Sequence, residues 1–191
     1  MSVKSVMIVG VGGQGTLLAS RILGAALVSD GYDVKVSEVH GMSQRGGSVV
    51  TYVRYGEKVY SPVVTPGEAD LILAFEQLEA ARWIPYLKKG GKLVVNTQSI
   101  DPMPVITGAM TYPDGIIKKL TAMDIDVTAV DALRLAEEAG SVKAVNVVLI
   151  GVMARRMDLD ESVWLNAIRE IVPEKFIEMN LKAFTLGYHL K

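Results

Sequence analysis

A six-residue run near the amino end constrains the fold of this chain more than any other feature. The run Gly10-Val-Gly12-Gly13-Gln14-Gly15 fits the pattern G-x-G-x-x-G. It follows a short apolar segment, 6–9, typical of a buried strand, and precedes 16–29, where apolar residues recur at helical spacing. Because glycines permit a tight turn and close backbone approach, the run predicts a strand–turn–helix unit that opens a layered α/β fold.

Strands and helices alternate along the rest of the chain. Asp30-Gly31 is expected to end the first helix, because glycine adopts the left-handed closing conformation at little cost. Periodicity predicts further strands at 34–39, 48–55, 58–61, 70–75, 92–97 and 126–130. It predicts further helices at 76–88, 114–122, 131–139, 142–157, 160–172 and 174–189.

This alternation predicts an α/β fold with a three-layer, mainly parallel, Rossmann-like sheet, helices on both faces, a β-hairpin and a helical C-terminal part. The strand at 34–39 would complete a β-α-β unit with the first strand. Gly56-Glu57 would connect the hairpin strands 48–55 and 58–61. Gly90-Gly91 marks a break, and a proline-marked crossing follows the strand at 92–97. Without a linker or repeat, 1–191 is expected to be one domain.

Composition excludes several classes of function. The chain has 20 Lys and Arg against 21 Asp and Glu, a balance that argues against a nucleic-acid binder. It has no cysteine, which excludes disulfides, a catalytic thiol, cysteine-held zinc and iron–sulfur clusters on its own thiolates. No metal site is expected, since the two histidines lie far apart in sequence. No apolar stretch approaches the roughly 20 residues of a membrane span, so we expect a cytoplasmic protein.

The glycine run has two possible roles. A helix that begins at Gly15-Thr16 presents free N–H groups that suit a phosphate, but the same turn in other α/β proteins only packs a helix on a strand. Glu38 ends a strand where dinucleotide-binding folds place the acid that binds the ribose. This keeps a stand-alone NAD- or FAD-binding Rossmann oxidoreductase as an alternative function.

A polar segment follows that strand. In His40-Gly-Met-Ser-Gln-Arg45-Gly-Gly-Ser48, Arg45 is suited to bind a carboxylate or phosphate, and the glycines leave backbone N–H groups free. The alternative is a solvated surface loop. Asn146 lies in an apolar helix and needs a hydrogen-bond partner if buried, either within the fold or in a ligand. Polar residues at other strand ends are expected to be helix caps or turn residues: Glu76-Gln77, Asn96-Thr97-Gln98 and Asp131.

Two segments together carry a family resemblance. Ile8-Val-Gly10-Val-Gly-Gly-Gln-Gly15 and Glu38-Val-His-Gly-Met-Ser-Gln-Arg-Gly-Gly-Ser48 resemble the gamma-type subunits of 2-oxoacid:ferredoxin oxidoreductases. They are most similar to the small (beta) subunit of the indolepyruvate ferredoxin oxidoreductases. Relatives that act on pyruvate or 2-oxoglutarate typically have Ser-Tyr-Gly-Pro-Glu-x-Arg-Gly-Gly in the second segment. Asn146 and the segment Asn180–Gly187 extend the resemblance over nearly the whole chain.

The resemblance implies a subunit without catalytic residues of its own. Thiamine diphosphate and iron–sulfur clusters would belong to a large partner subunit, which converts indolepyruvate or another aryl pyruvate to the acyl-CoA and reduces ferredoxin. This chain would assist assembly and the handling of coenzyme A and the 2-oxoacid. Its cofactor-binding residues would be Gly10, Gly12, Gly13, Gln14, Gly15 and Thr16. Residues facing the substrate or partner would be Glu38, His40, Met42, Ser43, Gln44, Arg45, Gly46, Gly47 and Asn146.

Overall fold

The computed structural model describes residues 2–40 and 46–190, and its centre is a six-stranded sheet of order β2-β3-β1-β4-β5-β6. The strands are β1 (Lys4–Val11), β2 (Asp33–His40), β3 (Ser48–Gly56), β4 (Ala69–Ala74), β5 (Leu87–Asn96) and β6 (Asp126–Val130). The pairs β1–β4, β4–β5 and β5–β6 are parallel, whereas β3 runs antiparallel to both β1 and β2. The mainly parallel α/β sheet is therefore confirmed.

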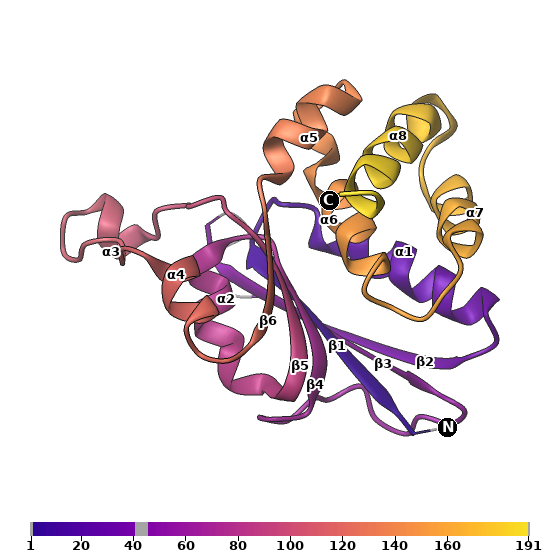
Figure 1. Cartoon of the computed structure of the whole chain (residues 1–191), viewed down its shortest axis with the longest axis horizontal. Helices are drawn as coiled ribbons and strands as arrows, with labels where there is room; N and C mark the ends of the chain where they lie inside the picture. Colours follow the sequence, from indigo (N-terminus) through magenta and orange to yellow (C-terminus); the bar gives the residue numbers. More distant parts are fainter. Residues whose placement is uncertain (1, 41–45, 191) are drawn as a thin grey trace.

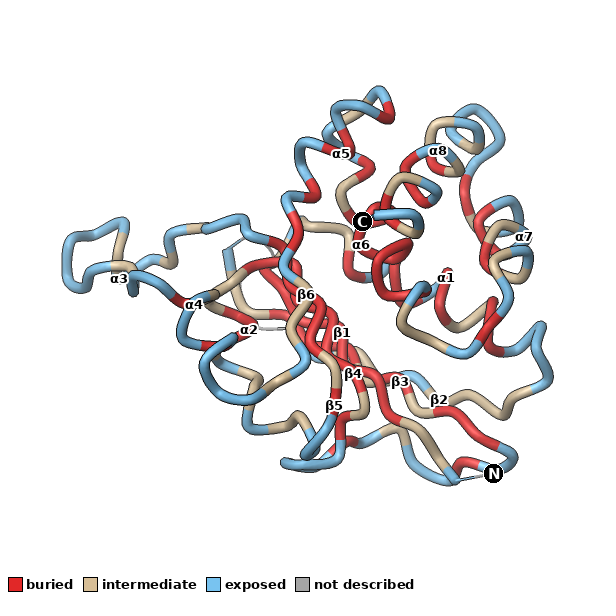
Figure 2. Tube along the Cα trace, viewed as in Figure 1, coloured by how far each residue is buried: buried red, intermediate tan, exposed pale blue. Residues whose placement is uncertain are grey.

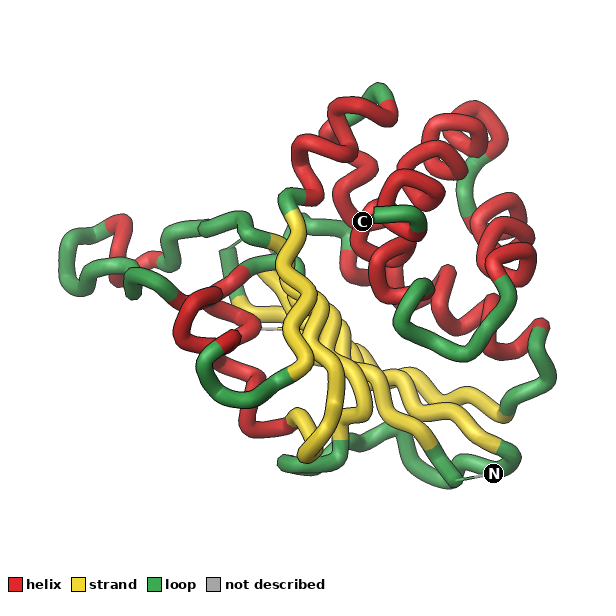
Figure 3. Tube along the Cα trace, viewed as in Figure 1, coloured by secondary structure: helices red, strands yellow, loops and turns green. Residues whose placement is uncertain are grey.

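Helices lie on both faces of this sheet (Figures 1 and 3). They are α1 (Thr16–Ser29), α2 (Gln77–Trp83), α3 (Met103–Ile106), α4 (Ile116–Thr121), α5 (Ala132–Ala139), α6 (Val145–Ala154), α7 (Glu161–Ile171) and α8 (Ile177–Tyr188). Short 3-10 turns precede β5, α6 and α8 at Ile84–Tyr86, Val142–Ala144 and Glu174–Phe176. Helices α1 and α5 to α8 lie on one side and α2 and α4 on the other, which confirms the helical C-terminal part.

The central strands are buried on both faces, which explains their unbroken apolar sequence. Val6 and Ile8 of β1 pack in the core beneath α1, whereas Met7 and Val9 pack in the core beneath α2. In Figure 2 the central strands are coloured as buried along the middle of the sheet. None of the described helices combines the length and apolar character needed to cross a bilayer.

The predicted position of the hairpin is wrong. No strand forms at 58–61, because β3 is already paired on both of its edges, with β1 and with β2. The backbone N–H of Val59 instead donates to the Asp33 carboxylate at 2.8 Å. The antiparallel pair is β2–β3, and β3 also separates β2 from β1, so the first two parallel strands are not neighbours.

Gly90-Gly91 does not interrupt the next strand. Strand β5 begins at Leu87 and passes through both glycines, and its register with β4 shifts between Ala69 and Leu71. Gly90 has φ +76°, so the glycines form an irregularity inside the strand. The expected helix at 76–88 is correspondingly shorter, ending as α2 at Trp83.

Helices α6 and α8 are in backbone contact. A Cβ atom on Gly151 of α6 would lie 2.2 Å from the Phe184 carbonyl oxygen. One on Gly187 of α8 would lie 2.1 Å from the Val148 carbonyl oxygen. Each helix therefore offers a glycine where the other approaches, and this contact holds the C-terminal helices together over the sheet.

Gly151→Ala is expected to lower the free energy of unfolding by about 2 kcal/mol or more, because the added methyl group meets backbone that must move. The matched control is Gly24→Ala in α1, where an added Cβ meets no atom within 4 Å. That control should raise stability by about 1 kcal/mol through helix propensity alone. Urea unfolding measures both variants, and equal stabilities would contradict the assigned contact.

Candidate functional site

The two segments singled out in the sequence meet at one edge of the sheet. Strands β1, β4, β5 and β6 end there and β3 begins there, and we call this edge the strand-tip face. The backbone N–H of Gly12 donates to the Gly47 carbonyl at 2.9 Å, and Val11 is paired with Ser48. His40 ends β2 opposite Val49 at the same edge. The predicted interface residues Met42, Ser43, Gln44 and Arg45 lie outside the described residues.

Gln14 fills the centre of the glycine turn. Its Oε1 accepts from the Val11 N–H at 2.8 Å, and its Nε2 donates to the Phe75 carbonyl at 3.0 Å and to Gln98 Oε1 at 3.1 Å. One side chain thus joins the tips of β1, β4 and β5. Gly10 makes room for it, since a Cβ there would lie 2.9 Å from Gln14 Oε1.

Asn96 continues this set of hydrogen bonds to the next helix. Its Nδ2 also donates to the Phe75 carbonyl, at 3.2 Å, and its Oδ1 accepts from the Ala132 N–H at 3.2 Å. Asp131 caps the same helix, α5, by accepting from the Arg134 N–H. We call Gln14, Asn96, Gln98 and the Phe75 carbonyl the amide network. The expectation of a helix cap is confirmed for Asp131, whereas Asn96 is the last residue of strand β5 and not a turn residue.

Asn146 joins the start of α6 to the glycine turn. It is 6% exposed, and its Nδ2 donates to the Gly15 carbonyl at 3.4 Å while its Oδ1 accepts from the Val147 N–H. Gly15 has φ +83°, and a Cβ there would lie 2.6 Å from Asn146 Nδ2. Its hydrogen bonds within the fold show that Asn146 holds the turn in place.

The first turn of α1 is suited to an anion. Within the described part of the chain no side chain caps its N–H groups, and no acidic residue lies in that turn. Thr16 is buried, and its methyl group would lie 3.3 Å from a Cβ on Gly10. A 14-residue helix with a free first turn carries partial positive charge at its amino end.

A depression of about 560 Å³ opens beside this helix end. Leu133 and Val142 on its rim are 41% and 55% exposed, and Lys143 is exposed beside them. We call it the Gly-turn depression; its lining consists of Gly13, Gln14, Gly15, Gln98, Leu133, Val142, Lys143, Val145 and Asn146. It combines backbone N–H groups, amides, one ammonium group and apolar side chains. Such a surface is suited to binding and orienting a ligand, and its lining includes no nucleophile or carboxylate.

Sequence reasoning missed Glu79. This carboxylate is 4% exposed and accepts from the Ser48 hydroxyl, from Trp83 Nε1 at 3.3 Å and from Arg82 Nε at 3.1 Å. Ser48 directly follows the Arg45-Gly-Gly sequence and is the first residue of β3, so Glu79 fixes the start of β3 on α2. No sequence signal distinguished Glu79 from an ordinary solvent-facing helix residue.

The interpretation of Glu38 as a ribose-binding acid is not supported. Glu38 pairs with Thr51 of β3, and Thr51 pairs with Ile8 of β1. Two strand spacings of about 4.8 Å therefore separate Glu38 from the strand that carries the glycine turn. In a dinucleotide-binding fold those two strands are neighbours. The insertion of β3 removes the geometry on which the stand-alone NAD or FAD alternative depended.

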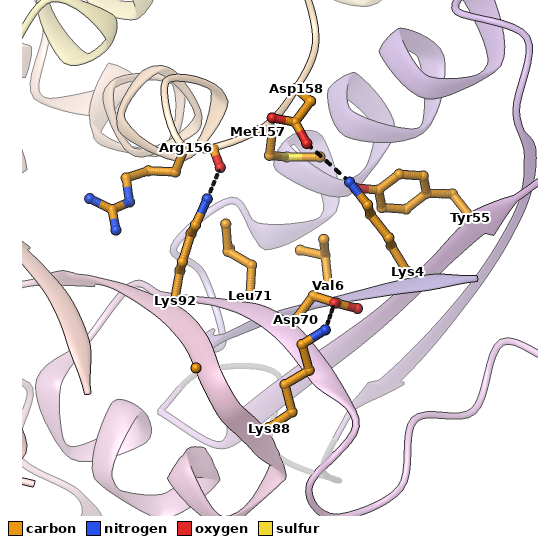
Figure 4. A pocket seen from close by; sticks show the side chains of 11 residues that line it. Lys4, Val6, Tyr55, Asp70, Leu71, Lys88, Lys92, Arg156, Met157 and Asp158 are labelled. Atoms are coloured by element: carbon orange, nitrogen blue, oxygen red, sulfur yellow. Dashed lines mark hydrogen bonds and ion pairs between the residues drawn. The ribbon is translucent and has the colours of Figure 1, made fainter. Parts of the chain in front are cut away.

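A second pocket, of about 190 Å³, lies at the opposite edge of the sheet (Figure 4). Lys4 forms an ion pair with Asp158 at 3.1 Å, Lys92 donates to the Arg156 carbonyl at 2.8 Å, and Lys88 pairs with Asp70. Lys4 and Lys92 hold the α6–α7 connection against β1 and β5, whereas Lys88 joins β5 to β4. Their partners give this pocket a structural role.

Comparison with known proteins shows the family to which this chain belongs. Residues 5–190 match the family model described as pyruvate ferredoxin/flavodoxin oxidoreductase. The chain belongs to that family. The indolepyruvate oxidoreductase subunit IorB of Thermococcus kodakarensis is 47% identical over 192 residues, covering 98% of this chain and 95% of the relative. The resemblance found in the sequence is thereby confirmed.

Solved structures of the family share the fold. The gamma subunit of a keto/oxoacid ferredoxin oxidoreductase from Geobacter sulfurreducens superposes with a TM-score of 0.73 at 26% identity, covering 97% of this chain and 96% of that one. The 2-oxoglutarate:ferredoxin oxidoreductase of Magnetococcus marinus, solved with 2-oxoglutarate, coenzyme A and succinyl-CoA bound, gives 0.77 at 19% identity. There the match covers 98% of this chain but only 30% of the longer chain.

Gln14→Ala is expected to lower the free energy of unfolding by about 2–3 kcal/mol, at about 1 kcal/mol for each of its three hydrogen bonds. Gln14→Glu should cost at least as much, since a carboxylate cannot donate to the Phe75 carbonyl. Gln98→Ala, at an exposed position, is the graded control and should cost less than about 1 kcal/mol. Denaturant unfolding in which Gln14→Ala matches the wild type would contradict a supporting role for the amide network.

Proposed function

We propose that this chain is the small subunit of an indolepyruvate:ferredoxin oxidoreductase, and that its strand-tip face binds coenzyme A and meets the catalytic partner chain. The observation that carries this is the 47% identity to an IorB subunit over nearly the full length of both chains. The structure supports it by joining the glycine turn to Gly47, the residue before β3, through the Gly12–Gly47 hydrogen bond.

The complex oxidatively decarboxylates the 2-oxoacid. The carboxylate leaves as carbon dioxide, the acyl group is transferred to the thiol of coenzyme A, and the electron pair passes to ferredoxin. The iron–sulfur clusters would reside on the larger chain, since this chain has no cysteine to ligate a cluster, and we place thiamine diphosphate on that chain with them. This chain contributes binding and orientation, which lower the entropic cost of bringing the reactants together.

The Gly-turn depression fits the chemistry of coenzyme A. Lys143 and the free N–H groups at the start of α1 suit its phosphates, and the apolar rim at Leu133 and Val142 suits its pantetheine arm. The family member from Magnetococcus marinus, solved with coenzyme A bound, supports the assignment of this ligand to the complex. The proposed role is therefore to hold the thiol donor where the partner chain uses it.

Reconstitution tests the proposal. The chain and its larger partner are purified separately and together, and ferredoxin reduction by indolepyruvate is followed with and without coenzyme A. We expect activity that depends on coenzyme A only when both chains are present. Full activity from the larger chain alone would overturn the proposed function.

Lys143→Ala in the reconstituted complex should raise KM for coenzyme A about 10-fold and change kcat little, because a hydrogen bond to a charged group contributes roughly 1.5 kcal/mol. The matched control is Lys89→Ala, an exposed lysine at the opposite edge of the sheet. A KM that responds equally to both substitutions, or to neither, would remove the Gly-turn depression as the coenzyme A site.

A further inference from the structure

One segment extends away from the rest of the molecule. Between the end of β5 and the start of α4 the chain makes a long excursion that contains α3, and we call residues 97–113 the projection. Figure 1 shows it reaching out beyond α2 and α4, and Figure 2 shows its outer part as exposed. It starts at the strand-tip face, where β5 ends, and it returns there at Tyr112, whose hydroxyl donates to Glu76.

The tip of the projection is apolar although it is exposed. Met103, Ile106 and Met110 are 63%, 65% and 66% exposed. In the sequence from 97 to 113 the only charged residue is Asp101. Several large apolar side chains grouped on one exposed segment mark an interaction surface, whereas single exposed apolar residues do not.

The tip has a defined shape. The Pro102 carbonyl accepts from the N–H groups of Val105 and Ile106, at 2.8 Å and 3.1 Å. The Pro104 carbonyl accepts from the Met110 N–H at 2.9 Å, which closes the far side of the turn. Prolines and these hydrogen bonds restrict the free segment, so little conformational entropy remains to be lost when a partner covers it.

Glu76 holds both ends of the projection. This residue is 1% exposed, and its Oε1 accepts from the Ile100 N–H at 3.2 Å and from the Tyr112 hydroxyl. Burial and the neighbouring Glu76 carboxylate raise the pKa of Tyr112, so its hydroxyl stays protonated and donates. Because Glu76 also caps α2 at the tip of β4, the projection is fixed to the strand-tip face.

We propose that the projection inserts its apolar tip, Met103, Ile106 and Met110, into an apolar recess on the larger chain of the same oxidoreductase. This rests on the proposed function, which makes that chain the partner. In the structure from Magnetococcus marinus the match covers 30% of a longer chain, so a unit of this fold is there covalently joined to the rest of such an enzyme. The scarcity of charge on the projection, where Asp101 is the one charged residue, favours a dry recess over an ionic contact.

The test measures association of the full chain with its larger partner. The triple variant Met103→Ser, Ile106→Ser, Met110→Ser should raise the dissociation constant of the complex at least about 100-fold, since apolar anchors dominate such contacts. The control variant Val28→Ser, Tyr60→Ser, Met123→Ser also removes exposed apolar side chains, 59%, 89% and 55% exposed, but at the opposite edge of the sheet. It should bind as the wild type does. Circular dichroism and thermal unfolding establish that both variants fold.

A second measurement tests whether the partner covers the tip of the projection, with single substitutions that change the tip little. Because the chain has no cysteine, Met110→Cys and Met123→Cys each introduce a single thiol. Maleimide labelling of this chain, followed by mass spectrometry, should slow at least 10-fold at position 110 when the larger chain is added, and stay unchanged at position 123. Equal labelling of position 110 with and without partner would overturn the proposal.

The remaining outcomes separate this inference from the proposed function. Unchanged association of the triple variant overturns the projection as a docking element, even if the complex turns over indolepyruvate. Loss of self-association alone, with the partner still bound, identifies a second copy as the occupant and also overturns it. Tight association that depends on the projection, in a complex that does not oxidise indolepyruvate, refutes the proposed function and supports the docking element.

Discussion

The Phe75 carbonyl is the point at which the strand tips are joined. It accepts from Gln14 and from Asn96, so the glycine turn after β1, the end of β4 and the end of β5 share one acceptor. Asn96 then holds the first N–H of α5, and Asn146 holds Gly15 from α6. The position of each helix that borders the Gly-turn depression therefore depends on an amide side chain, and the shape of the depression follows from these few hydrogen bonds.

Local sequence predicted most of the secondary structure because burial and periodicity are local signals. Helix α1 has the expected bounds, 16–29, and β6 the expected bounds, 126–130. Both carry an uninterrupted pattern and end at residues that stop it. The neighbours of β3 could not be predicted in this way. A strand with apolar residues on both faces fits several places in a sheet, and its pairing with β1 and β2 is decided by long-range contacts.

The candidate site was predictable where backbone conformation demands glycine. Gly15 has a positive φ, and Gly10 lies where any side chain would collide with Gln14, so the pattern located the turn. The identity of the residue inside the pattern carried no such signal, and the bridging role of Gln14 emerged only from the arrangement of three strands. Glu79 was missed for the same reason, since its partner Ser48 is distant in sequence.

Amides suit the role proposed for this surface, which is to bind and orient reactants for chemistry performed by another chain. A carboxylate or imidazole in the lining of the Gly-turn depression would change charge with pH, whereas Gln14, Gln98 and Asn146 hold their geometry without titrating. The single ammonium group in the lining of the Gly-turn depression, Lys143, then supplies charge only at its rim. The projection is instead positioned by Glu76, whose buried side chain accepts from the Ile100 N–H and the Tyr112 hydroxyl. If the proposed function holds, a strand-tip face of fixed geometry is the physical contribution that this chain makes to its complex.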